Sequence, residues 1–135
     1  MMKCVMVINE HLPIGLIANT SAVLALTIGN TIEDMIGDDV IDRDGQLHRG
    51  ITKLSIPLLK GNPELIRSIR HTVSSNGGDV FWVDFCDVAQ QCVDYADYTA
   101  KLEQCPEEDL NYLGIALYGP AKKINKLTGN IGLLR

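Results

Sequence analysis

The chain has 135 residues, of which 46% are hydrophobic and 21% charged, and its formal net charge is −5. This length allows one hydrophobic core and the composition excludes a disordered chain, so we expect a single domain over residues 1–135. The acidic balance argues against a general nucleic-acid coat, which needs a basic face.

Neither a secretory leader nor a membrane span is expected. The start of the chain lacks the long apolar region and the small-residue cleavage site of a signal peptide. The uncharged stretch between His11 and Glu33 is broken up by polar residues, and its longest strictly apolar run is 22–26, whereas a bilayer span needs roughly 20 apolar residues. We therefore expect a cytoplasmic protein that makes no contact with a membrane.

The cysteines give no sign of a metal site. They form no Cys-x-x-Cys pair, and no histidine lies near them at a zinc-like spacing. Free thiols in a reducing compartment are the expected state, with no metal bound.

The first half of the chain predicts a strand, a helix and a hairpin. An apolar, β-branched run at 4–8 indicates a buried strand, and a helix follows at 14–28. This helix is apolar nearly all round, so we expect burial on more than one side and, in so small a domain, a homodimer contact. Asp44-Gly45 predicts a two-residue type I′ turn between hairpin arms at 40–41 and 46–48.

The acidic segment around this hairpin does not match the ligand spacing of an EF-hand, so we interpret it as a solvated loop and not as a calcium site.

The second half alternates strands with helices. Asn62 is suited to cap a helix that has Pro63 at its first position, and Asn76-Gly77-Gly78 is suited to end it. The other predicted elements are strands at 54–59, 79–85 and 113–118, a short helix at 87–92, a helix with its continuation at 94–110 that has Tyr95 among its inward positions, and a last helix at 121–127. This order predicts α/β layers with a mixed sheet.

The loop after the first strand is the first candidate site, because ligands of α/β proteins collect at the carboxyl ends of strands. It holds Asn9 and His11, and His11 with Glu10 is suited either to general-base chemistry or to a surface pair. Asn19 and Thr20, on the first turns of the apolar helix, either line a pocket or bond each other and the backbone.

No glycine-rich nucleotide loop and no GxSxG elbow is present, so no cofactor and no catalytic serine is expected from these motifs.

The C-terminal segment is opposite in charge to the rest of the chain. From residue 118 onward it carries no acidic side chain and four basic ones: Lys122, Lys123, Lys126 and Arg135. Lysines bind phosphate as point charges, and lysines near a helix end also favour the helix dipole. A phosphate-bearing ligand is one interpretation of this segment, and ordinary helix-end lysines are the other.

Both ends of the chain resemble known families. The stretches 7–19 and 113–120, followed by Asn125-Lys126-Leu127-Thr128-Gly129, look like a bacterial family labelled a domain of unknown function, number two thousand, over the whole length. More distantly, the same ends resemble type II peptidyl-tRNA hydrolases, which carry Gly-Pro and then a helix ending Thr-Gly-x-Leu. Gly119-Pro120 and 128–131 match that second pattern.

The resemblance implies a peptidyl-tRNA hydrolase II-like three-layer α/β domain with a mixed four-stranded sheet flanked by helices. It does not carry the activity over, because Leu16 stands at the position of the hydrolases' functional lysine and their Gln-Cys-x-His motif is replaced at 20–23.

We therefore expect a protein that binds a small or phosphate-bearing ligand without hydrolysing peptidyl-tRNA. The residues expected to bind it are Asn9, His11, Asn19, Thr20, Tyr118, Lys122 and Lys126. Two alternatives stay open: a hydrolase acting on peptidyl-tRNA or a related ester, and a non-catalytic interaction subunit. A solvent-facing polar cleft would favour the first and a packed, dry first helix the second.

Overall fold

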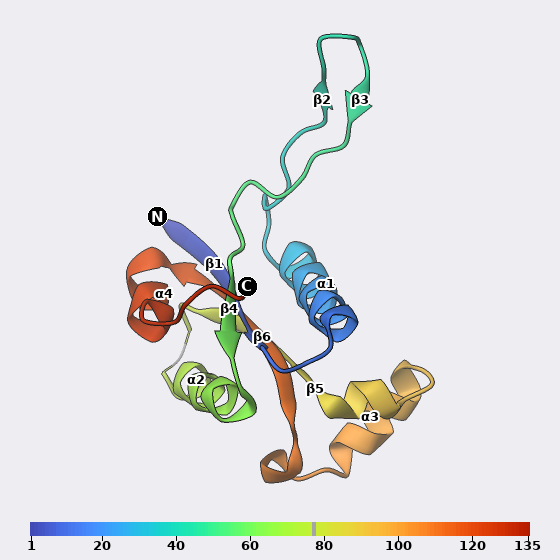
Figure 1. The fold of residues 1–135 in the computed structure, drawn as a ribbon, viewed down its shortest axis with the longest axis vertical. Coiled ribbons are helices and arrows are strands. Elements are labelled where there is room, and N and C mark those ends of the chain that lie inside the picture. The colour runs from blue at the N-terminus through green and yellow to red at the C-terminus, as the bar shows by residue number, and fades with distance from the viewer. Residues whose placement is uncertain (77) are drawn as a thin grey trace.

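The computed structural model describes every residue of the chain except Gly77 (Figure 1). Its main sheet has the strand order β4-β1-β6-β5. These strands are β1 (Met2–Asn9), β4 (Leu58–Gly61), β5 (Phe81–Cys86) and β6 (Tyr112–Pro120). β1 pairs in parallel with β4 and antiparallel with β6, and β5 is antiparallel to β6. The predicted mixed four-stranded sheet is confirmed.

Helices cover both faces of this sheet, which gives three layers. The α-helices are α1 (Ile14–Thr31), α2 (Pro63–Ser75), α3 (Tyr95–Glu103) and α4 (Ala121–Thr128), and two 3₁₀ helices are η1 (Asp87–Gln91) and η2 (Glu107–Asp109). α1 lies on one face, and α2 and α4 lie on the other (Figure 1). The apolar residues of β1 therefore contribute to two cores, one on each face of the sheet.

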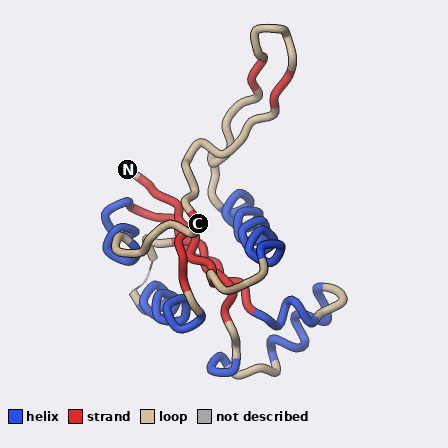
Figure 2. Tube along the Cα trace, in the orientation of Figure 1, coloured by secondary structure: helices blue, strands red, loops and turns tan. Residues whose placement is uncertain are grey.

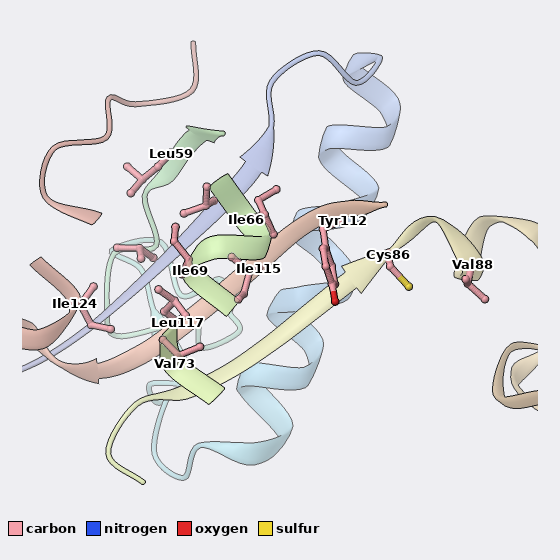
Figure 3. Packing of buried hydrophobic residues seen from close by; sticks show 12 residues of the cluster. Leu59, Ile66, Ile69, Val73, Cys86, Val88, Tyr112, Ile115, Leu117 and Ile124 are labelled. Carbon is pink, nitrogen blue, oxygen red and sulfur yellow. The ribbon is translucent and has the colours of Figure 1, made fainter. Parts of the chain in front are cut away.

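The two cores follow from the alternation of side chains along a strand. On β1, Val5 and Val7 point toward α2 and α4, while Met6 and Ile8 point toward α1. Figure 3 shows the first of these cores, in which Ile66 and Ile69 of α2 and Ile124 of α4 lie with Ile115 and Leu117 of β6.

α1 packs on the sheet along one side only. Leu24 and Ile28 are buried against the sheet, whereas Ile14 and Leu26 are 86% and 75% exposed. The expectation that this helix is buried on more than one side is wrong for a single chain, because no described element lies over the face that carries Ile14 and Leu26. By length and composition alone α1 is apolar enough to cross a membrane.

Between α1 and β4 the chain forms an arm, residues 36–52, that projects from the body (Figure 2). Its tip is the hairpin of β2 (Val40–Ile41) and β3 (Leu47–His48), as predicted. The predicted type I′ turn is wrong: Gly45 has φ of 81°, but Asp44 does not have positive φ. Asp42 is the reason, because its carboxylate accepts the N–H groups of Asp44 and Gln46 and so holds a different turn.

The other local predictions hold with small shifts, except that the strand predicted at 54–59 forms only at Leu58–Gly61. Asn62 caps α2 by accepting the N–H of Leu65 at 2.8 Å, and α2 ends at Ser75 with Asn76 as its cap. The predicted stop at Asn76-Gly77-Gly78 lies partly outside the described residues, at Gly77. Tyr95, expected to point inward, is 78% exposed, while Tyr98 packs on the core.

The last residues of the chain run beside β4. Lys60 donates its N–H to the carbonyl of Gly132 at 2.9 Å, and Leu134 donates to Leu58 at 2.8 Å. We call residues 129–135 the tail. This pairing was not predicted, and it brings the tail next to α2 and the end of β1.

Candidate ligand-binding site

The carboxyl ends of β1 and β4 meet at one edge of the sheet, where Asn9 is the register partner of Gly61. Asn9 is 8% exposed and its side-chain oxygen accepts the N–H of His11 at 3.0 Å. His11 is exposed, and its ring makes no hydrogen bond to a described residue. Asn9 therefore shapes the loop, while His11 reaches into solvent.

Asn19 and Thr20 lie on different sides of α1. Thr20 is fully buried against β6, so close that a Cβ at Gly114 would lie 2.7 Å from the Thr20 methyl carbon. Asn19 is exposed. Successive helix residues point about 100° apart, so these two side chains do not line one pocket.

Tyr118 and Lys122 lie at the other end of the sheet from Asn9. Tyr118 is the register partner of Cys4, near the start of β1, whereas Asn9 ends that strand. Lys122 is exposed on the first turn of α4. The structure therefore does not bring the expected site residues together, and of these residues only Lys126 lines the hollow described next.

A hollow of about 570 Å³ lies among α2, α4 and the tail, and we call it the tail hollow. Its apolar lining residues are Leu65, Ile69, Leu127 and Ile131. Its polar lining residues are Glu10, Lys60, Ser68, Thr72, Lys126 and Asn130. Small-molecule sites combine apolar side chains, which cover the ligand, with polar groups that orient it, and this lining offers both kinds.

The positive charge at the tail hollow comes from two lysines, Lys60 and Lys126. Among the described residues, neither Lys60 nor Lys126 forms an ion pair, whereas the nearby Lys123 is paired with Asp79. Lys60 also lines a neighbouring hollow of about 420 Å³ with Arg135. Glu10 is the one carboxylate in the lining of the tail hollow. The arrangement provides two ammonium groups for an anion and one acceptor for a donor group.

Two features position these groups. Glu10 donates its backbone N–H to Gly61 at 3.0 Å, which fixes the start of the loop that Asn9 shapes. The pairing of Lys60 with Gly132 holds the tail against β4. Sequence reasoning found Lys126 from the basic C-terminus but missed Lys60, because its place in the site depends on tail pairing that leaves no local signal.

A second polar cluster ties η2 to α2. Glu107 accepts hydrogen bonds from His71 and from the Tyr112 hydroxyl, both at 2.8 Å, and it pairs with Arg67. Arg67 also donates to the backbone carbonyls of Glu107 and Leu110. Burial, and then the hydrogen bond to Glu107, raises the pKa of Tyr112. Because Arg67 bonds two carbonyls, we interpret this cluster as a structural clamp.

Neither metal ligation nor an activated thiol is indicated by the side chains the structure describes. No group of three His, Cys, Asp or Glu side chains among them is placed to hold a metal ion. Burial raises the pKa of the Cys4 thiol to about 11, and burial is also the main cause of a raised pKa at Cys86. A thiol with a raised pKa is a poor nucleophile at neutral pH.

Comparisons with known proteins place the fold. The model of a family described as protein of unknown function, DUF2000, matches residues 2–135. A solved structure of a protein of unknown function from Agrobacterium tumefaciens strain C58 matches with a TM-score of 0.85 and 16% identity, over 98% of this chain and 96% of that one. No curated protein matches the chain. At this identity the structural likeness supports the fold and carries no activity.

Proposed function

The chain belongs to DUF2000, a family of proteins of unknown function, and on this premise we propose that it binds a small ligand carrying a phosphate or similar anionic group in the tail hollow. The observation that supports this most is that Lys60 and Lys126, neither of which pairs with a described carboxylate, both line one partly apolar hollow of about 570 Å³.

The chemistry of the lining defines the ligand class. Lys60 and Lys126 would neutralise the anionic group, since lysine ammonium groups bind phosphate as point charges. The apolar part of the ligand would lie on Leu65, Ile69 and Leu127. Glu10 would accept a hydrogen bond from a hydroxyl or amino group of the ligand and would disfavour molecules of high negative charge.

This proposal keeps the expected ligand class and moves the site. Lys126 stays in it and Lys60 joins it. Asn9 acts indirectly, through the loop that carries Glu10. Thr20 is not part of the proposed site, because its side chain is fully buried between α1 and β6.

Calorimetric titration with phenyl phosphate tests the proposal, because this probe joins an apolar ring to one phosphate. We expect Lys60→Gln and Lys126→Gln each to weaken binding about tenfold, the loss of one charge-assisted contact. Lys122→Gln is the matched control: it removes a charge from the same helix as Lys126 but lies outside the hollow, so binding should stay unchanged. Equal weakening by all three substitutions would point to nonspecific attraction and contradict the site.

We also propose that the fold is of the peptidyl-tRNA hydrolase II type without that activity. The Gly119-Pro120 turn into α4 supports the likeness, and Leu16 at the position of the functional lysine argues against catalysis. Incubation with peptidyl-tRNA should give no release of tRNA above a no-enzyme blank. Release at a rate proportional to protein concentration would favour the hydrolase alternative.

A further inference from the structure

The arm is held in shape by its own hydrogen bonds. At its base, Gly37 donates its N–H to Ile51 at 2.9 Å. Asp39 accepts the N–H of Gly50 at 2.8 Å and pairs with Arg49. The two chain segments are so close here that a Cβ at Gly50 would collide with the carbonyl of Gly37. The arm therefore has a defined conformation, although it projects away from the body (Figure 2).

Apolar side chains on this arm are left uncovered by the residues that the structure describes. Each of the following is at least 50% exposed: Ile36, Val40, Ile41, Leu47 and Ile51. Ile41 and Leu47 are register partners and so lie on one face of the hairpin. An isolated two-stranded hairpin is marginally stable in water, and large exposed apolar patches mark contact surfaces.

The outer face of α1 is a second uncovered apolar surface. Ile14 and Leu26 stand out on it, with small exposed residues such as Ala18 and Ala22 between them. No charged side chain occurs between His11 and Glu33. This face offers a neutral surface to which another apolar element can approach closely.

We propose that two copies of this chain form a dimer by exchanging arms, with the arm of each copy packed on the outer face of α1 of the other. α1 ends at Thr31 and the arm follows directly, so one twofold axis near this junction covers both surfaces in both copies and leaves no open end. The proposal does not depend on the ligand proposed above.

Charge favours a second copy over other occupants. Two ion pairs lie within the arm, Asp39–Arg49 and Asp42–His48, and a third, Asp34–Lys53, lies just below its base, so part of the arm's charge is already paired before it meets a neutral helix face. Its remaining carboxylates, such as Asp38 and Asp44, would repel a nucleic acid or an anionic membrane.

The two uncovered surfaces are also large enough to form a stable dimer interface. A stable interface takes about 20–30 residues from each partner. The arm and the outer positions of α1 together supply residues on this order.

Sedimentation of the wild type and of three variants tests the dimer. The arm variant is Ile41→Glu with Leu47→Glu, and the helix variant is Leu26→Glu. The control is Val93→Glu, at a valine that is 90% exposed on the segment between η1 and α3, outside the arm and the face of α1 that carries Ile14 and Leu26. We expect the wild type and the control to be dimers at micromolar concentration. Burying a glutamate at the contact should raise the dissociation constant of the arm and helix variants at least about thirtyfold.

Mixing the arm variant with the helix variant gives the sharper result. In such a pair, the intact arm of one copy meets the intact helix of the other, so one of the two contacts is restored and association should recover in part. Because all four substituted residues are at least half exposed, the variants should keep the circular dichroism spectrum of the wild type, which confirms folding. A wild type that stays monomeric at about a hundred micromolar, or variants that neither dissociate alone nor associate when mixed, would overturn the proposal.

Discussion

Thr20 Oγ1 is a buried side-chain oxygen with no hydrogen-bond partner among the described residues. Thr128 is buried almost as fully, but its hydroxyl donates to Ile124 at 2.8 Å. An unpartnered buried hydroxyl costs free energy, whereas a bonded one contributes about 1 kcal/mol. The same substitution should therefore act in opposite directions at these two positions.

We expect Thr20→Val to raise the free energy of unfolding by about 1 kcal/mol, and Thr128→Val to lower it by about the same amount. Valine keeps the shape of threonine and removes only the hydroxyl. Urea denaturation of the two variants measures both changes. Destabilisation by Thr20→Val as large as that by Thr128→Val would mean that the Thr20 hydroxyl has a partner.

The four cysteines should differ in reactivity. Cys4 and Cys86 are buried, and burial raises the pKa of both, in the case of Cys4 to about 11 from an ordinary 9.0. At neutral pH this lowers the thiolate fraction of Cys4 about a hundredfold. Cys92 and Cys105 are only half-buried.

Iodoacetamide should therefore label Cys92 and Cys105 of the native protein well before Cys4 and Cys86, as read by mass spectrometry of the peptides. In urea the four should react alike. Fast native labelling of Cys4 would contradict the closed core around β1.

At the scale of elements, the clamp of η2 on α2 predicts a dependence of stability on pH. The hydrogen bond from His71, and then that from Tyr112, lowers the pKa of Glu107 below its ordinary 4.5. A carboxylate with a lowered pKa stabilises the fold above its ordinary pKa, and this stabilisation is lost as the pH falls through the lowered value.

We expect Glu107→Gln to be less stable than the wild type at pH 7 and the difference to shrink below about pH 4. Glu108→Gln is the control, because Glu108 is exposed and forms no hydrogen bond or ion pair with a described residue. Urea midpoints across this pH range give the comparison. A difference that stays constant down to pH 3 would show that the carboxylate charge has no part in the clamp.

Elements that depend on near neighbours were predictable from the sequence. Asn62 caps α2 because its bond reaches only to Leu65, three residues on. The hairpin arms were found for the same reason. The turn type was missed because the Asx bonds of Asp42 outweigh the preference of Asp44-Gly45 for a type I′ turn. Tyr95 was misplaced because periodicity alone does not say whether a helix face meets another layer.

At the scale of the whole molecule, the candidate site depends on contacts between distant parts of the chain. Lys60 and the tail are brought together by β-type pairing at Gly132, and no local pattern in the tail predicts it. The basic C-terminus indicated an anionic ligand, and one of its lysines, Lys126, does line the tail hollow. Tyr118 lies far from Asn9 because β6 runs antiparallel to β1, which places Tyr118 beside Cys4. Thr20 is kept out of any site by its burial against Gly114 of β6.

The most direct measurement of the central claim is a nuclear magnetic resonance titration of the ¹⁵N-labelled protein with phenyl phosphate. The ligand proposal predicts amide shifts confined to residues around the tail hollow: Lys60, Ser68, Thr72, Lys126, Asn130 and Gly132. Residues near Thr20 and along the arm should not move. Shifts centred on His11 and α1 instead, or no shifts at all, would contradict the site.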